Sequence, residues 1–248
     1  MARFFLSRDY MDLEHGIITI TGDDAHHIAY SLRMAVGDAL TVCDMQKTEY
    51  LCEITEIRPT CVTLRVNEEK QSDTELPISL HLYQSIPKGD KMDYIVQKAV
   101  ELGITDITPV KSARCIVNLD AKGAENKCRR WQRIAEEAAK QCGRGCVPTV
   151  HAPLSFEKAC TMTKDIPAIF CYEGDGTISL KTIVKELCKD GVPRAAAFFI
   201  GPEGGYDIKE VERATEQGML LAGLGKRILR CETASGFVLA AIAYEIEL

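Results

Sequence analysis

The C-terminal third of the chain alternates short apolar runs with glycine-rich turns. Residues 196–200 (AAFFI) are uncharged and bounded by turn residues, which is typical of a strand buried on both faces. The segment 201–205 (GPEGG) ends this run, and a helical pattern begins after Asp207, the expected N-cap, and stops at Gly218. Residues 219–224 predict a further strand. It leads into a second glycine turn, Gly225-Lys226-Arg227.

The middle of the chain repeats the same alternation of strand and helix. The apolar spacing predicts strands at 78–83, 104–110 and 167–172, and helices at 91–103, 124–142 and 180–189. A final helix is expected at 234–247. This order of elements predicts a parallel sheet with helices packed on it. The last helix is apolar nearly all round and must therefore be buried, by the fold itself or by a second subunit.

The N-terminal residues have a different pattern, rich in short strands. Strand-like runs occur at 17–20, 39–43, 50–57 and 61–66, separated by glycine and aspartate turns, with a helical segment at 24–34. Residues 68–77 (EEKQSDTELP) are polar and read as a linker. We therefore expect two domains, 1–70 and 71–248.

Composition excludes several classes of protein. Of 248 residues, 46% are hydrophobic and 27% charged, as in ordinary globular proteins, and no apolar run approaches the ~20 residues of a membrane span. Charged Arg3 and Arg8 near the N-terminus argue against a secretory leader, so a cytoplasmic protein without membrane contact is expected. The eleven cysteines include no CxxC spacing and are expected to be buried thiols, neither metal ligands nor disulfides.

Charge is unevenly distributed along the chain. The net charge is −6, yet residues 84–146 hold 12 Lys and Arg against 8 Asp and Glu. One basic segment on an acidic protein suits a specific RNA footprint. The alternative is a solvated helix face, which is the usual meaning of such a run of charges.

The two glycine turns, 201–205 and 225–227, are the strongest functional signal. A glycine-rich turn between a buried strand and a helix lets a ligand approach bare backbone N–H groups. A single Gly-Gly turn is more often only a turn, and neither the dinucleotide nor the P-loop spacing is present. Two such turns around one βαβ unit favour a ligand site, because open α/β sheets bind ligands at the carboxyl ends of their strands.

These motifs resemble a known family. The segments IGPEGG and LGKRILRCETA are similar to the paired signature of the RsmE family, bacterial methyltransferases of the SPOUT superfamily. Glu137, Gln141, Arg144 and Pro148 match the family pattern E-x-x-x-Q-x-x-R-x-x-x-P, and 33–38 (RMAVGD) resembles its PUA-like barrel. The chain departs from the pattern at Lys226, where a proline is expected.

The resemblance implies a fold, an activity and partners. Residues 1–70 would form a PUA-like β-barrel that binds RNA, and residues 71–248 an α/β SPOUT domain with a mostly parallel sheet and a trefoil knot. The enzyme would methylate N3 of one uridine in 16S ribosomal RNA of the small subunit, with S-adenosylmethionine as donor. It would act as a homodimer and without a metal.

The resemblance also implies the site residues. The segments after three strands would hold S-adenosylmethionine: Tyr172, Ile200, Gly201, Pro202, Glu203, Gly204, Gly205, Leu224, Gly225, Ile228, Leu229, Arg230, Thr233 and Ala234. N3 of uridine must lose a proton before it attacks, so the site needs a cation and a proton acceptor. Arg230 is the expected cation and Glu203 the expected base. Hydroxide is an alternative base, and Glu232 is alternatively a helix cap.

Basic residues outside the loops are expected to contact RNA phosphates: Arg3, Arg8, Arg33, Lys88, Lys91, Arg114 and Arg144. Two other functions remain open. One is a catalytically inactive RNA-binding ribosome-assembly factor of the same fold, and the other a nucleotide-phosphate enzyme, which the absence of a P-loop lysine disfavours. The pattern determines neither the target nucleotide nor whether free RNA or an assembled subunit is the substrate.

Overall fold

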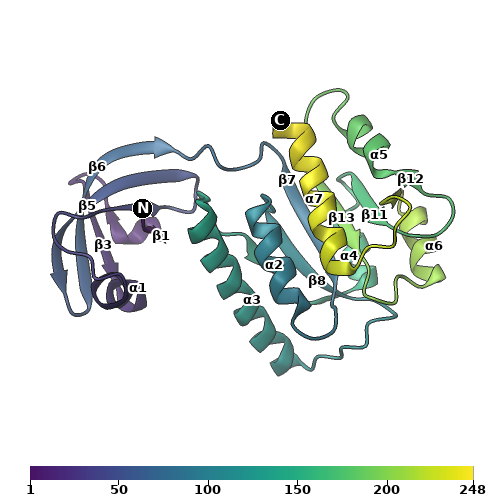
Figure 1. Ribbon diagram of the computed structural model, residues 1–248, viewed down its shortest axis with the longest axis horizontal. Helices are drawn as coiled ribbons and strands as arrows, with labels where there is room; N and C mark the ends of the chain where they lie inside the picture. Colours follow the sequence, from purple (N-terminus) through teal and green to yellow (C-terminus); the bar gives the residue numbers. More distant parts are fainter. Residues whose placement is uncertain (248) are drawn as a thin grey trace. The chain divides into compact units, whose positions relative to one another are not determined.

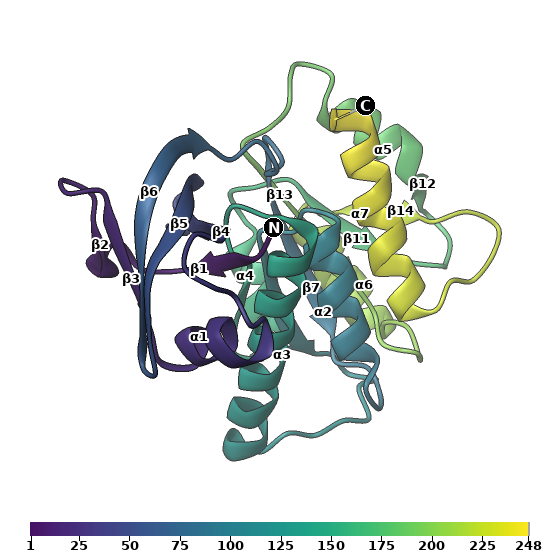
Figure 2. The ribbon, with the colours of Figure 1, turned by 60° about the vertical axis from the view of Figure 1, so that its left-hand side comes forward.

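The structure, a computed structural model, describes residues 1–247. The chain forms two compact units. The first comprises Met1–Glu75 together with Ala139–Val147, and the second comprises Leu76–Ala138 together with Pro148–Leu248, of which residue 248 lies outside the described part. Figures 1 and 2 show the mixed α/β composition predicted for the chain.

The first unit is built on a six-stranded sheet in the order β1-β4-β5-β6-β3-β2. Its strands are β1 (Arg3–Phe5), β2 (Met11–Asp12), β3 (Ile17–Thr21), β4 (Ala39–Cys43), β5 (Thr48–Arg58) and β6 (Cys61–Gln71). All neighbouring pairs are antiparallel except β1 and β4. The core lies on the face that carries Ile18, Leu40, Ile54 and Leu64, all fully buried.

Helical residues close one side of this core. The short helix α1 (Gly22–His26) continues as a π-helical turn, His27–Ser31, where a single helix was predicted over 24–34. The predicted strands are confirmed, but the predicted linker is wrong at its start because β6 continues through Gln71 as the partner of Thr48. The C-terminal part of β6 is polar and shows little alternation of apolar and polar residues, so the sequence pattern places the end of this strand too early.

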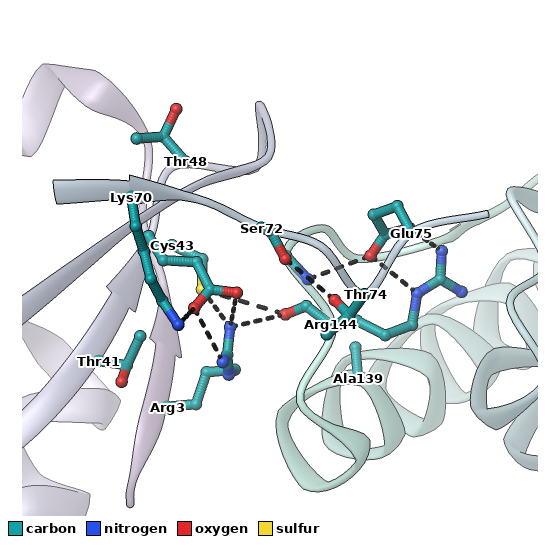
Figure 3. Close-up of polar contacts among 12 residues, drawn as sticks. Arg3, Thr41, Cys43, Thr48, Lys70, Ser72, Thr74, Glu75, Ala139 and Arg144 are labelled. Atoms are coloured by element: carbon teal, nitrogen blue, oxygen red, sulfur yellow. Dashed lines mark hydrogen bonds and ion pairs between the residues drawn. The ribbon is translucent and has the colours of Figure 1, made fainter. Parts of the chain in front are cut away.

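The segment Ala139–Val147 belongs to the first unit because buried polar contacts hold it there. Arg144 pairs with Glu75, and Gly145 N donates to Glu75 Oε1 at 3.1 Å. A Cβ on Gly145 would lie 2.5 Å from Ser72 Cβ, so only glycine fits this approach. Figure 3 shows these contacts. They join residues about 70 positions apart, which no local pattern reveals.

The second unit is a parallel sheet in the order β10-β8-β7-β13-β11-β14-β12, with β9 paired to β8. Its strands are β7 (Ser79–Ser85), β8 (Asp106–Lys111), β9 (Thr149–Val150), β10 (Leu154–Ser155), β11 (Ala168–Cys171), β12 (Ile178–Ser179), β13 (Ala195–Ile200) and β14 (Leu220–Gly223). Every pair in it is parallel, as predicted. The predicted trefoil knot stays a prediction.

Helices connect these strands. They are α2 (Lys91–Glu101), α3 (Ala121–Cys142), α4 (Phe156–Met162), α5 (Leu180–Leu187), α6 (Ile208–Glu216) and α7 (Cys231–Glu247). All but the short α4 were predicted, and α3 runs on into the first unit at Ala139. Figures 1 and 2 show α2 and α7 side by side.

Stacked aromatic rings form the core on the face that α4 and α6 cover. Tyr83 stacks on Phe199 with ring centroids 4.6 Å apart, and Phe170 lies 4.2 Å from Tyr206. Phe156 of α4 packs edge-on against this group. Phe170 of β11 and Phe199 of β13 pack with rings from β7, α4 and the segment after β13, and burial of these rings stabilises the pairing of the two strands.

The last helix is less buried than its composition predicts. Val238, Leu239 and Ile242 are fully buried, but Phe237 is 45% and Tyr244 68% exposed. Of the two alternatives expected for this helix, burial by the fold itself is therefore incomplete in the single chain.

Candidate functional site

Three strand ends meet at one edge of the parallel sheet. Strand β11 lies between β13 and β14, with Phe170 opposite both Phe199 and Leu221. The segments that follow these strands line one cavity of about 590 Å³ in the second unit. Its lining residues are Lys91, Cys171, Tyr172, Glu173, Thr177, Ile200, Gly201, Pro202, Glu203, Gly205, Tyr206, Gly223, Leu224, Gly225, Lys226, Arg227, Ile228, Leu229, Arg230, Cys231 and Ala234.

This cavity brings together most of the residues predicted to hold the methyl donor. The segments 200–203 and 224–230 both contribute to its wall, together with Tyr172 and Ala234. Gly204 and Thr233 do not line it. The carbonyl of Gly204 accepts a hydrogen bond from Arg114, and Thr233 is exposed in the first turn of α7.

Backbone geometry explains the glycines. Gly205 has a φ of 65° and Gly225 a φ of 108°, the left-handed region in which a side chain is strained. The helix after the first turn begins with the predicted capping box. Asp207 accepts from the N-terminal backbone of α6, and Glu210 accepts from Asp207 N at 3.0 Å. These capping hydrogen bonds, made within residues 207–210, therefore fix the direction in which α6 leaves the cavity.

Glu210 also holds a second loop against the glycine turn. Its other carboxylate oxygen accepts from Ala113 N at 2.8 Å, although the side chain is almost fully buried. Arg114 in the same loop donates to Gly204 O at 3.0 Å and lies 3.7 Å from Asp207. The predicted phosphate ligand Arg114 is thus engaged in fixing the GPEGG segment.

Glu203 is held as a carboxylate. Its Oε1 lies 2.6 Å from Lys91 Nζ and accepts from Lys88 N at 3.1 Å. Burial alone would raise the pKa of Glu203, but the hydrogen bonds from Lys91 and from backbone N–H groups, together with the charge of Lys91, outweigh it and the pKa is lowered. A carboxylate with a lowered pKa is a poor proton acceptor, which argues against the predicted role of Glu203 as general base.

Two thiols lie in the cavity wall. Burial raises the pKa of Cys171 to about 12 and that of Cys231 to about 12. Cys231 Sγ donates to Glu232 Oε2 at 3.1 Å. Both residues are therefore neutral at physiological pH and unsuited to nucleophilic chemistry. All eleven cysteines are free, as the sequence predicts.

Arg230 is exposed at the cavity, immediately before α7. Its backbone carbonyl accepts from Thr233 N and Ala234 N, which starts the helix. The backbone of Arg230 is thereby fixed at the cavity by the start of α7, and its role as the expected cation stays a prediction.

Sequence reasoning assigned several lining residues elsewhere or missed them. Lys91 was expected on RNA, whereas it lies in the cavity wall. Thr177, Tyr206 and Gly223 carried no assignment. Glu173 opens a further glycine-containing turn, 173–176, directly after a strand, which is a local signal, whereas nothing local indicates that the Tyr206 ring packs against Gly201.

Two predicted phosphate ligands, Arg3 and Arg144, form ion pairs and hydrogen bonds inside the first unit (Figure 3). Arg144 is only 4% exposed and pairs with Glu75. Arg3 donates to Glu49 at 2.8 Å and to Arg144 O at 3.1 Å. These guanidinium groups pair with buried carboxylates, which argues against the predicted phosphate contacts.

The other basic candidates are exposed. Arg8 pairs with Asp44, which is buried, while its own side chain is 49% exposed. Arg33 and Lys88 are exposed residues, in the first and second unit respectively.

Residues 1–247 contain neither a cluster suited to a metal ion nor a helix suited to a membrane. Among them, no group of three or more His, Cys, Asp or Glu side chains is arranged to hold a metal ion. None of the helices in this range is both long enough and apolar enough to cross a membrane.

Comparison with known proteins identifies the family. Residues 74–243 match the family model of an RNA methyltransferase domain, and residues 20–66 match that of an RNA methyltransferase PUA domain. The ribosomal RNA small subunit methyltransferase E of Bacillus subtilis is 38% identical over 100% of this chain and 98% of its own length. The chain belongs to this methyltransferase family.

Solved structures agree with this assignment. The ribosomal RNA small subunit methyltransferase E of Neisseria gonorrhoeae, bound to S-adenosyl methionine, is 31% identical with a TM-score of 0.84, covering 99% of this chain and 98% of that one. A putative methyltransferase of Legionella pneumophila in complex with the same cofactor is 27% identical, with the same TM-score and coverage. The fold class expected from the sequence is confirmed.

Proposed function

We propose that this chain is an S-adenosylmethionine-dependent methyltransferase that modifies N3 of a uridine in 16S ribosomal RNA. The observation that carries the proposal is the single cavity built from the ends of β11, β13 and β14, in a chain of the methyltransferase E family. The rival reading, an inactive RNA-binding assembly factor, would not require an intact donor cavity.

The cavity suits S-adenosylmethionine, which supplies an electrophilic methyl group on a sulfonium. Its volume of about 590 Å³ lies within the ~300–1,000 Å³ of small-molecule sites. Backbone N–H and C=O groups at Gly201 and Gly225 can meet the polar edge of an adenine, and Tyr172 and Leu229 can pack on its faces. The remaining predicted lining residues would complete the wall.

Arg230 is assigned the stabilisation of the uridine anion. When N3 loses its proton, negative charge spreads over O2 and O4, and a guanidinium placed beforehand stabilises that charge. Glu203 is occupied by Lys91, so we assign proton removal to hydroxide from solvent, the alternative that needs no side chain.

RNA would be held by the PUA domain and by exposed cations of both units. Arg8, Arg33, Lys88 and Arg114 are predicted phosphate ligands that remain exposed, and Arg114 also donates to Gly204 O. They would position the RNA without reading its sequence. The substrate is then ribosomal RNA of the small subunit, in the cytoplasm.

The exposed face of α7 supports a homodimer. Phe237 and Tyr244 are 45% and 68% exposed, and Tyr94 on the adjacent α2 is 51% exposed. An aromatic patch of this kind on packed helices suits a partner subunit. Light scattering of the purified protein tests this state, and a monomer at all concentrations would contradict it.

The proposed function is tested by mass spectrometry of ribosomal RNA. A deletion strain should lack one N3-methyluridine in 16S RNA, and the wild-type gene should restore it. The Arg230→Ala gene should not. An unchanged nucleoside profile in the deletion strain, together with no S-adenosylmethionine binding by calorimetry, would favour the inactive assembly factor.

A further inference from the structure

Lys91 joins three segments that are far apart in the sequence. It is the first residue of α2, and its Nζ lies 2.6 Å from Glu203 Oε1 in the GPEGG turn. The same nitrogen lies 3.9 Å from Glu232 Oε2 in the first turn of α7. One ammonium group therefore lies near two chain segments that both contribute residues to the cavity wall.

The surroundings of this group are partly shielded from water. The side chains of Lys91, Glu203 and Glu232 are 32%, 29% and 18% exposed. The hydrogen bond to Glu203 raises the pKa of Lys91, and the pKa values of both carboxylates are lowered although their burial opposes this. All three groups are thus charged at neutral pH, and the lysine compensates two negative charges.

A second contact makes the geometry specific. Glu203 Oε1 also accepts a hydrogen bond from Lys88 N at 3.1 Å, so a backbone N–H of the turn before α2 binds the carboxylate as well. On the other side, Glu232 Oε2 accepts from the buried thiol of Cys231. Glu203 is thus held by the turn before α2 and Glu232 by its own segment, and the Lys91 ammonium group lies near both carboxylates.

We propose that Lys91 is a positioning residue of the donor site. Its ammonium group holds the 201–205 turn and the start of α7 at the separation that the donor needs. Without it, Glu203 and Glu232 face each other as uncompensated like charges, and the turn that carries Glu203 moves outward. This inference rests on the proposed function, because it takes the cavity to be the S-adenosylmethionine site.

This role differs from the phosphate contact that the sequence suggests for Lys91. A phosphate ligand would affect RNA affinity and its salt dependence, and leave donor binding in RNA-free protein unchanged. A positioning residue would instead affect donor binding in RNA-free protein and leave RNA affinity and its salt dependence unchanged. The two roles are therefore separated by measuring the donor alone.

The experiment is calorimetry of S-adenosylmethionine binding to the RNA-free, full-length protein. Lys91→Met should bind the donor about tenfold more weakly than wild type, since a charge-assisted hydrogen bond is lost. Lys91→Arg, which keeps the charge, should recover most of the affinity. The matched control is Lys98→Met on the same helix, which breaks the Lys98–Glu101 pair at 2.8 Å and should bind as wild type does.

Two further measurements separate positioning from general destabilisation. Thermal unfolding should show small shifts for both variants, because Lys91→Met loses two partly exposed ion pairs and Lys98→Met loses one. The double variant Lys91→Met with Glu203→Gln should bind the donor more tightly than Lys91→Met alone, because the repulsive charge is removed. If Lys91 only stabilises the fold, the double variant should not recover donor affinity in this way.

The outcomes are distinct. Unchanged donor affinity in Lys91→Met would overturn the role of Lys91 while leaving the proposed function intact. Loss of affinity in both lysine variants, in step with their unfolding temperatures, would also overturn it. Failure of the wild-type protein to bind the donor would overturn the proposed function and this inference with it.

Discussion

Arg144 and Glu75 form a buried ion pair with two contacts. Arg144 Nε donates to Glu75 Oε1 at 3.1 Å, Nη2 donates to Oε2, and the side chains are 4% and 7% exposed. The pair ties Ala139–Val147 into the first unit (Figure 3). Arg144 is the arginine of the family motif, so in this chain that position has a structural partner.

Breaking this pair should destabilise the first unit. Arg144→Ala leaves Glu75 buried without its partner, and loss of one member of a buried pair costs about 3–5 kcal/mol. Urea unfolding gives the free energy of unfolding. The control, Arg58→Ala, removes an exposed pair with Glu56 and should cost less than about 1 kcal/mol. Equal losses in the two variants would contradict the assignment.

The same pair predicts a pH dependence of stability. Burial alone would raise the pKa of Glu75, but hydrogen bonding and charge from Arg144 lower it below its usual 4.5. A carboxyl whose pKa is lower in the folded state stabilises the fold above its unfolded pKa, and this contribution is lost as the pH falls through the folded value. The free energy of unfolding should therefore fall more steeply below pH 4.5 in wild type than in Glu75→Gln. Parallel pH profiles would rule this out.

Arg230→Ala should slow methyl transfer far more than it weakens donor binding. Removing one preorganised group that stabilises developing negative charge costs on the order of 100-fold in rate. Single-turnover methylation of small-subunit RNA measures the rate, and calorimetry the donor affinity. Arg213→Ala on α6, which only breaks a surface pair with Glu216, should react as wild type does. A rate near that of wild type in Arg230→Ala would exclude this role.

Gly174→Ala should disturb the donor cavity through Tyr172. A Cβ at position 174 would lie 2.4 Å from the Tyr172 ring, which forms part of the cavity wall, so the ring must move. Overpacking of this kind costs ~1–3 kcal/mol in stability, and a loss of about 1.4 kcal/mol in the donor-bound state gives about tenfold weaker donor binding. The control is Gly176→Ala, where φ is 80° but no atom lies within 4 Å of the added Cβ. If it weakens donor binding equally, strain in the loop is responsible and not the tyrosine.

Local patterns in the sequence determined most of the secondary structure. The capping box at Asp207 and Glu210, the apolar strand Ala195–Ile200 and the helix Lys91–Glu101 are specified by neighbouring residues, so their bounds are predictable to within a few positions. The two glycine turns indicated the site for the same reason, because glycine marks backbone conformations that other residues avoid.

Only the tertiary structure decided which charges serve the cavity and which serve the fold. Lys91, Arg114 and Arg144 look alike in the sequence, as basic residues in a basic segment. In the folded chain Lys91 meets Glu203, Arg114 meets Gly204 and Arg144 meets Glu75. Each partner is distant along the chain, and an ion pair depends on separation in space, which periodicity and composition do not encode.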